Sequence, residues 1–228
     1  MHDTEPRLHE RLAGVSGQIE DAAREAARNP AGITTIVVTK FHPASLVREL
    51  YALGVRDFGE SRHQEAQPKI AELADLGSLP TWHFIGQLQS KKAKQVREYA
   101  QVIHSIDRDS LITALAGDQL RDVFLQVNLT DDSERGGIAA AGLDLLAERV
   151  AETEGLRLLG LMAVAPLGVN PRRAFATVRS LSERLQRQHP EASALSMGMS
   201  SDFRDAILEG ATHLRIGTAI TGKRPTPG

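Results

Sequence analysis

The sequence predicts an α/β protein folded as a single-domain (β/α)8 TIM barrel with an extra helix at its N-terminus. Eight short, β-branched apolar runs alternate with segments of helical periodicity, a pattern typical of βαβ units around a parallel sheet. The 228 residues come close to the roughly 250 of a typical barrel, and no Pro/Gly/Ser-rich linker divides them. A closed barrel uses nearly the whole chain, and an open doubly wound sheet is the alternative.

The first thirty residues predict a helix that precedes the barrel. Apolar side chains recur there at helical spacing among charged neighbours, at Leu8, Leu12, Val15 and Ile19. Asn29 and Pro30 end the pattern, because a residue that precedes proline disfavours the helical conformation. We therefore expect residues 1–30 to form a helix packed on the barrel, and residues 31–228 to form the barrel itself.

The expected strands are the eight apolar runs, and the expected helices lie between them. The strands are Ile33–Thr39, Val55–Gly59, Thr81–Ile85, Val102–Ile106, Val123–Asn128, Leu156–Met162, Ala194–Met197 and His213–Ile216. The helices are Leu46–Leu53, His63–Leu76, Lys91–Ala100, Ser110–Ala116, Leu143–Thr153, Arg172–His189 and Ser201–Glu209. Gly54, Gly155 and Gly210 each separate a helix from the next strand, where glycine can adopt the positive φ that closes a helix.

Composition argues against several classes of function. A formal net charge of −2 and an aromatic content of 4% do not suit a nucleic-acid-binding surface. No run of about 18 apolar residues occurs, so we expect no membrane span. The polar N-terminus does not resemble a secretion signal, and with no cysteine in the chain we expect a cytoplasmic protein. The eight histidines show no HExxH-like spacing, so we expect no metal site.

The C-terminal ends of the strands carry the reactive groups in a (β/α)8 barrel. Lys40 follows the first predicted strand and would point into the mouth of the barrel. Partial burial favours the neutral amine, which is the nucleophile that Schiff-base chemistry requires. A lysine that simply extends from the strand end into solvent is the alternative.

Two turns that follow the last two strands have the composition of a phosphate site. Ser200 and Ser201 open a predicted helix, where hydroxyls and unpaired N–H groups can bind an anion. Gly217 and Thr218 follow the eighth strand, and loops in these two places commonly bind phosphate in this fold. An ordinary helix cap at the two serines is the alternative.

Three other polar features have less specific explanations. Arg215 lies within the eighth strand, and alternation does not decide which way it points, because barrel strands are buried on both faces. His83 in the third strand indicates a hydrogen-bonded structural histidine more than a catalyst. Lys91, Lys92 and Lys94 are typical of a solvated helix face and do not indicate an RNA site.

Seven motifs at strand ends occur in the order found in one protein family. They are Val38–Lys40, Asp57–Glu60, Trp82–Ser90, Gln126–Asn128, Gly160–Ala163, Ser196–Ser200 and Arg215–Thr218. With them the chain resembles the pyridoxal 5'-phosphate (PLP) homeostasis proteins, known in bacteria as YggS, from about Ile33 to Gly222. The resemblance implies a single barrel like the N-terminal domain of alanine racemase, a PLP protein of fold type III.

The resemblance also implies roles for individual residues in binding PLP as a cofactor. Lys40 would carry PLP as a Schiff base, and Arg215 would donate a hydrogen bond to the pyridine nitrogen. The other implied contacts are phosphate contacts from Ser200, Gly217 and Thr218, ring contacts from Met162 and Ser61, and a nearby hydroxyl from Ser196.

Three positions depart from the pattern common in the family. Ser61 stands where many members have asparagine, and its shorter side chain reaches less far toward the edge of the ring. Gln87 stands at a common proline, and Lys91 stands at a common asparagine. Lys40 and both phosphate turns are intact.

The expected function is PLP binding for intracellular PLP homeostasis and supply, without robust catalysis. Arginine only donates hydrogen bonds, so Arg215 against the pyridine nitrogen would leave the ring a weak electron sink. Alanine racemase takes its second base and its active-site cover from a further domain and a partner subunit, whereas this sequence ends soon after Thr218. We expect a monomer, with PLP-dependent apo-enzymes as candidate recipients. The alternatives are a small PLP-dependent amino-acid racemase and a cofactor-free sugar-phosphate barrel enzyme.

Overall fold

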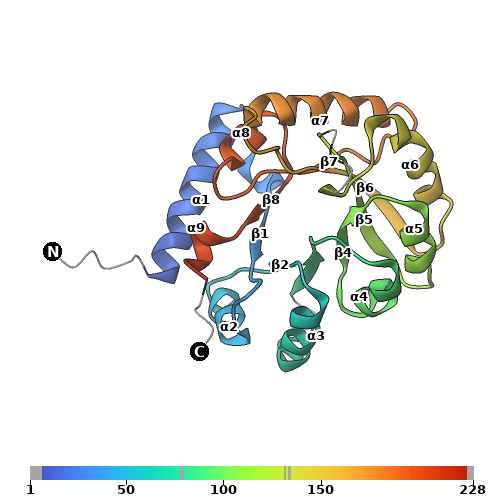
Figure 1. Cartoon of the computed structure of the whole chain (residues 1–228). Coiled ribbons are helices and arrows are strands. Elements are labelled where there is room, and N and C mark those ends of the chain that lie inside the picture. The colour runs from blue at the N-terminus through green and yellow to red at the C-terminus, as the bar shows by residue number, and fades with distance from the viewer. Residues whose placement is uncertain (1–6, 78–79, 131, 133–134, 225–228) are drawn as a thin grey trace.

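The computed structural model describes residues 7–77, 80–130, 132 and 135–224, so residues 1–6 and 225–228 of the two predicted segments lie outside it. Eight parallel strands close into a barrel in chain order, with helices around it (Figure 1). The closed (β/α)8 prediction is confirmed, and the open sheet is wrong. The strands are β1 (Thr34–Val38), β2 (Asp57–Glu60), β3 (Thr81–Phe84), β4 (Val102–Ile106), β5 (Arg121–Gln126), β6 (Leu156–Met162), β7 (Ala194–Ser196) and β8 (His213–Ile216).

The helices follow the predicted alternation. They are α1 (Leu8–Glu25), α2 (Ala44–Ala52), α3 (His63–Glu72), α4 (Ala93–Tyr99), α5 (Asp109–Leu115), α6 (Leu143–Ala151), α7 (Pro171–Leu185), α8 (Phe203–Leu208) and α9 (Thr218–Thr221). Among the helices that the structure describes, none has the length and apolar character needed to cross a bilayer.

Three strands, β4, β6 and β8, have the predicted bounds, whereas β5 lies two residues earlier than predicted. Helices α3 and α7 each end four residues before the predicted end. Strand β2 begins at Asp57 and not at Val55, because the Val55 N–H closes α2 by donating to Leu50 O at 3.0 Å, beyond Gly54 with φ 95°. Helix α8 begins at Phe203 and not at Ser201, because the preceding turn is closed by its own hydrogen bonds.

Helix α1 lies outside the barrel, against α8 and α9 (Figure 1). It ends at Glu25, before the predicted end, since Ala27 adopts a φ of 53° and the Arg28 N–H returns to Ala23 O at 2.9 Å. Two arginines connect this segment to the last two helices: Arg11 Nε donates to Ile220 O at 2.7 Å, and Arg28 Nη1 donates to Ile207 O at 3.0 Å. The segment therefore braces the helices that follow β7 and β8.

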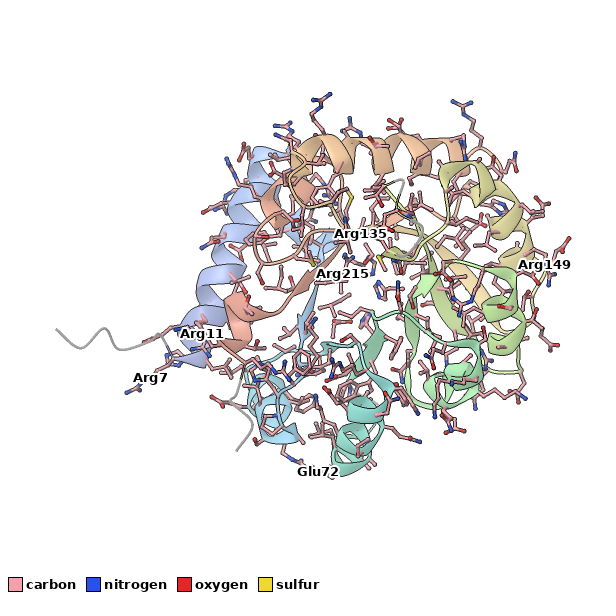
Figure 2. All side chains as sticks on the ribbon, viewed as in Figure 1. Arg7, Arg11, Glu72, Arg135, Arg149 and Arg215 are labelled. Carbon is pink, nitrogen blue, oxygen red and sulfur yellow. The ribbon has the colours of Figure 1, made fainter. Side chains whose placement is uncertain are left out.

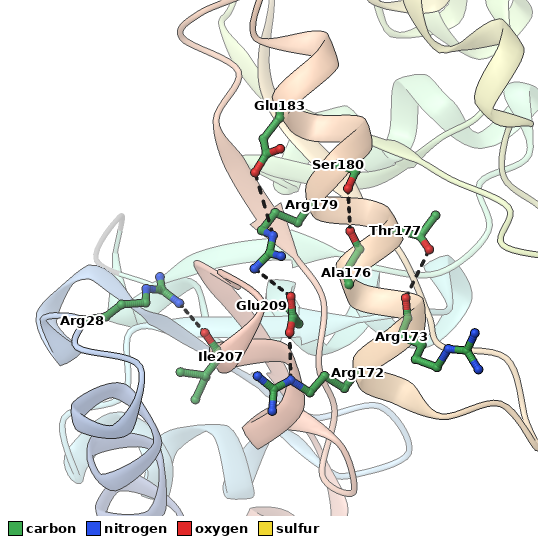
Figure 3. A network of polar contacts seen from close by, with 10 residues as sticks. All are labelled: Arg28, Arg172, Arg173, Ala176, Thr177, Arg179, Ser180, Glu183, Ile207 and Glu209. Carbon is green, nitrogen blue, oxygen red and sulfur yellow. Dashed lines mark hydrogen bonds and ion pairs between the residues drawn. The ribbon is translucent and has the colours of Figure 1, made fainter.

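A buried carboxylate joins α7 to the end of α8 (Figure 3). Glu209 is 5% exposed and accepts a hydrogen bond from Arg172 Nε at 2.9 Å. Arg179 Nη1 lies 2.8 Å from the other oxygen of the same carboxylate. The two arginines are about half exposed, so they neutralise Glu209 while they remain largely hydrated.

Alternate strand residues point into the barrel. A Cβ added to Gly59 would lie 3.0 Å from Ile36 Cγ2 and 3.4 Å from side-chain atoms of Val38 and Ile85, so these positions share one face. Val38 and Ile85 line the cavity at the mouth of the barrel, so that face is the inner one. Ile36 is paired with Arg215 across β1 and β8, and paired residues of parallel strands share a face. Arg215 therefore points inward, which settles the direction that the sequence left open.

Candidate functional site

A pocket of about 490 Å³ opens at the C-terminal ends of the strands, with contributions from β1 and β8 and from the loops after β1, β2, β3, β6, β7 and β8. Six of the eight predicted site residues line it: Lys40, Ser61, Ser200, Arg215, Gly217 and Thr218. The rest of its wall comes from Val38, Ile85, Gly86, Val164, Met199 and Ser201. The structure thus brings together residues that are up to 178 positions apart in the chain, from Lys40 to Thr218.

Lys40 enters the pocket two residues beyond Val38, on the inner face of β1. The next residue, Phe41, has a φ of 68°, which residues other than glycine adopt only at a cost in free energy. Its ring lies 4.8 Å from the Arg62 guanidinium and 3.8 Å from that of Arg224. Within the described chain the Lys40 amine has no hydrogen-bond or ion-pair partner, so it is available to a ligand.

A second lysine supports the strand end from outside the barrel. Lys69 Nζ donates to Glu60 Oε1 at 2.6 Å and to Thr39 O at 2.8 Å, and the Thr39 hydroxyl donates to the same Glu60 oxygen at 2.8 Å. Burial raises the pKa of Glu60, and the charge of Lys69 opposes that rise. Lys69 is therefore held in a buried pair, whereas Lys40 is free to react.

The two predicted phosphate turns lie side by side. The Ala219 N–H donates to Ser200 Oγ at 3.3 Å, which connects the turn after β7 to the turn after β8. Asp202 closes the first turn by accepting from the Met199 N–H at 2.6 Å. In the described part of the chain, the N–H groups of Ser200, Ser201 and Thr218 donate no hydrogen bond. These groups and the nearby hydroxyls form a donor-rich corner of the pocket.

Arg215 places a buried guanidinium in the wall of the pocket, with the residue 4% exposed. Figure 2 labels it near the centre of the barrel. Its Nη1 donates to Ser196 Oγ at 2.7 Å and its Nη2 donates to Ala163 O at 2.9 Å. Burial lowers the pKa of Arg215 to about 10, which still leaves the guanidinium charged at neutral pH. The arrangement fixes the orientation of the group while the side chain still lines the pocket.

The remaining two predicted residues lie one layer deeper. Ser196 is fully buried and reaches the pocket only through Arg215. Met162 is buried in the barrel interior with Val102 and Phe124. The structure does not test the roles that the resemblance implies for these residues, and they stay predictions.

The sequence did not identify the apolar wall of the pocket, formed by Ile85, Gly86 and Val164. Gly86 follows the third strand inside one of the quoted motifs, and this position was its available signal. A Cβ added there would lie 2.1 Å from Ser61 O, so the close approach of these two loops requires glycine.

Known proteins match this chain over nearly all of its length. The family model described as "Alanine racemase, N-terminal domain" matches residues 18–225. The pyridoxal phosphate homeostasis protein of Pseudomonas aeruginosa is 43% identical over 222 residues, which cover 95% of this chain and 96% of the relative. That of Mycobacterium leprae is 39% identical over 241 residues, which cover 96% and 94%. The chain belongs to the pyridoxal phosphate homeostasis protein family.

Solved structures support the family membership. PipY of Synechococcus elongatus, solved with PLP bound, is 38% identical, with a TM-score of 0.83 over 95% of this chain and 100% of its own. Alanine racemase from Corynebacterium glutamicum is 15% identical, with a TM-score of 0.70 over 95% of this chain and 62% of its own, and it shows the fold alone. The resemblance inferred from the seven motifs is confirmed.

Proposed function

We propose that this family member binds PLP covalently through Lys40 and serves in PLP homeostasis and supply. The observation that carries the proposal is the arrangement of one pocket, with an unpaired amine, a buried guanidinium and a donor-rich corner. A relative that is 38% identical over 95% of this chain has been solved with PLP bound.

The pocket has the donor set that PLP requires. The hydroxyls of Ser200 and Thr218 and the unpaired N–H groups beside them suit a phosphate, which accepts hydrogen bonds through several oxygens. A Cβ on Gly217 would have its nearest neighbour at 3.6 Å, so the glycine leaves space on the ligand side of the turn. Val38, Ile85 and Val164 offer apolar surface to a planar ring.

Each residue acts on the bound ligand through its own chemistry. PLP supplies an aldehyde that reacts with an amine and a conjugated ring that can accept electrons. Lys40 offers the amine, and Arg215, which can only donate, would hold the pyridine nitrogen as an acceptor. That nitrogen would then carry no proton of its own, so the bound ring would draw electrons only weakly. The site favours holding the cofactor over catalysing reactions of a carbanion.

We further propose that the protein is a carrier without robust turnover. Among the described residues that line the pocket, Lys40 is the only one with an amine, imidazole or carboxylate that could serve as a base; the others are glycine, apolar residues, serine, threonine and arginine. A racemase requires a second acid–base group on the opposite face of the substrate. We propose that the carrier is a cytoplasmic monomer that supplies PLP-dependent apo-enzymes.

Borohydride reduction of the PLP-loaded protein, followed by peptide mapping, tests the covalent site. We expect the reduced adduct on the peptide that contains Lys40, and none in Lys40→Ala. Lys69→Met is the matched control at the other lysine of this region, and its adduct on Lys40 should persist even if its stability falls. An adduct elsewhere, or none in the unaltered protein, would refute the proposal.

Turnover separates the carrier from the small racemase. The loaded protein should racemise or deaminate common amino acids no faster than free PLP does. A reproducible rate that disappears in Lys40→Ala would favour the racemase. Light scattering coupled to size exclusion tests the monomer, and equilibrium mixing with an apo-enzyme tests the transfer of PLP.

A further inference from the structure

A row of hydrogen-bonded polar side chains, from Arg215 to Asp57, crosses the interior of the barrel below the pocket. Arg215 Nη1 lies 2.7 Å from Ser196 Oγ, which lies 2.8 Å from His104 Nδ1. His104 Nε2 lies 2.9 Å from His83 Nδ1, and His83 Nε2 lies 3.0 Å from Asp57 Oδ1. The five residues of the row come from β8, β7, β4, β3 and β2, so the row depends on the closed barrel and not on any local segment.

The row of hydrogen bonds connects the pocket to the opposite end of the barrel. Arg215 lines the pocket, whereas Asp57 is the first residue of β2 and has a side chain that is 31% exposed. Ser196 and His104 are fully buried, and His83 is 3% exposed. Buried polar groups are costly unless they are satisfied, so a complete row of hydrogen bonds here is a specific arrangement.

With both histidines neutral, the Asp57 end of the row determines the direction of every hydrogen bond. The carboxylate of Asp57 can only accept, so His83 carries its proton on Nε2 and its Nδ1 is an acceptor. His104 then donates to His83 from Nε2, which leaves His104 Nδ1 to accept from the Ser196 hydroxyl. Ser196 Oγ in turn accepts from Arg215, which can only donate. Each histidine then has one defined tautomer.

The environment of His104 agrees with this assignment. Burial lowers the pKa of His104 well below the ordinary value, and positive charge on Arg215, or on His83 or His213 when protonated, acts in the same direction. A third interior histidine, His213, is not part of the row, because its Nδ1 is 2.8 Å from Thr212 Oγ1. It shares the barrel interior with His104, at 6.4 Å between ring centroids.

We propose that Asp57, His83, His104 and Ser196 are positioning residues that fix Arg215 against the pyridine nitrogen of bound PLP. This inference rests on the proposed function. Hydrogen bonds that all point one way polarise one another, and this row begins at a cation and ends at an anion. The row therefore stabilises the charged guanidinium in one orientation. A substitution of Asp57 should alter the position of Arg215 in the pocket, although Asp57 lies at the far end of the barrel.

The tautomers of the two histidines test the direction of the hydrogen bonds in the row without any cofactor. Long-range proton–nitrogen correlation spectra of the nitrogen-15-labelled apo-protein distinguish the two tautomers and the protonated ring, and His83→Gln and His104→Gln assign the signals. We expect His83 and His104 to be neutral with the proton on Nε2 near neutral pH. A proton on Nδ1 of His104 would reverse the direction of the row and overturn the proposal.

Variants of the loaded protein test the effect on the cofactor. His104→Leu breaks the row, and His104→Gln restores one acceptor and one donor in one side chain. We expect His104→Leu to shift the absorption band of the bound cofactor and its pH profile, and to speed PLP dissociation about tenfold or more, from the loss of support to a charged hydrogen bond. His104→Gln should recover most of both properties. His213→Leu, a matched interior histidine outside the row, should resemble the unaltered protein.

Asp57→Ala provides the decisive variant if His104→Leu does not fold. It alters the partly exposed end of the row, far from the pocket, and should shift the same band in the same direction as His104→Leu. If both variants match His213→Leu while the unaltered protein carries its adduct on Lys40, the positioning role is wrong and the proposed function stands. If the unaltered protein carries no adduct, the proposed function fails, and the tautomers still report whether the row exists.

Discussion

At the scale of single residues, Phe41 shows how the chain holds its reactive amine. Two non-glycine residues in the described chain, Ala27 and Phe41, have a positive φ, and Phe41 directly follows Lys40. The Phe41 N–H lies 3.3 Å from Glu65 Oε2, and two arginines pack on its ring. Backbone strain of this kind persists only where the surroundings impose it, so we infer that the turn restricts the direction of Lys40.

Glycine at the two positive-φ positions should have different effects. Ala27→Gly relieves the unfavourable conformation at a helix end and should raise the free energy of unfolding by about 1 kcal/mol, with PLP retention unchanged. Phe41→Gly relieves the same strain but removes the ring and frees the backbone beside Lys40, so PLP should dissociate faster. Urea unfolding and the decay of PLP absorbance during dialysis measure the two effects. Equal retention in both variants would show that the turn does not position the amine.

The hydroxyls of the donor-rich corner should contribute separately to affinity. Ser200→Ala and Thr218→Ala each remove a donor to a charged phosphate, and each should weaken PLP binding by roughly 1.5–3 kcal/mol. Thr177→Ala is the control, because that hydroxyl donates to Arg173 O on α7, outside the pocket. Spectroscopic titration with PLP measures the affinities. Unchanged affinity in both variants would assign phosphate binding to the backbone N–H groups alone.

At the scale of elements, the sequence predicted the strands better than the side chains that meet between them. β4, β6 and β8 have the predicted bounds. The position of Lys40 and of the two turns at one pocket could be predicted, since each lies within four residues of the end of a strand. The direction of Arg215 could not, because both faces of a barrel strand are buried and only the pairing of Ile36 with Arg215 decides it.

The row of hydrogen bonds from Asp57 to Arg215 could not be predicted from the sequence for the same reason. His83 was predicted as a hydrogen-bonded structural histidine, and its bonds to Asp57 and His104 confirm that expectation. Its partners come from other strands, and their contact depends on the register of the closed barrel. Short-range patterns in a sequence carry no information on such contacts.

The carboxylate of Glu209 should control how firmly α8 is attached to α7. Glu209→Gln keeps the shape but leaves Arg172 and Arg179 without their buried anion, and it should lower the free energy of unfolding by about 1–3 kcal/mol. Glu183→Gln is the matched control, because Glu183 pairs with the same Arg179 at 3.9 Å with its side chain 67% exposed, and such pairs contribute well under 1 kcal/mol. Urea unfolding compares the two variants. Equal losses would show that burial adds nothing to this ion pair (Figure 3).

At the scale of the whole molecule, the barrel interior combines a binding function with a cost in stability. Apolar residues fill most of a typical barrel interior, whereas here His83, His104 and His213 share it with Arg215. Neutral histidines are compatible with the buried cation, but protonated ones would add positive charge beside it. The stability of the fold should therefore depend on pH through His104 and His213, whose pKa values are lowered, even though they lie below the pocket.

Mild acid should destabilise the protein, and His213 allows the size of the effect to be assigned. Burial, with a smaller effect of the charge of His83, lowers the pKa of His213 from 6.5 to about 4. Between these values the unfolded chain binds a proton that the folded chain excludes, so the free energy of unfolding falls as the pH drops from 6.5 toward 4, by about 3 kcal/mol for this residue. His104, with a lowered pKa, adds to the loss, whereas the raised pKa of Glu60 opposes it.

The comparison with His213→Leu isolates this contribution from the other two. Urea unfolding at pH 7 and at pH 4.5 should show a smaller loss for His213→Leu than for the unaltered protein, because the variant has no proton to take up at that position on unfolding. His9→Gln, which removes an exposed histidine of α1, should follow the unaltered protein at both pH values. If His213→Leu lost as much stability in acid as the unaltered protein, His213 would be titrating normally inside the barrel, and the interior would contain enough water to solvate an imidazolium.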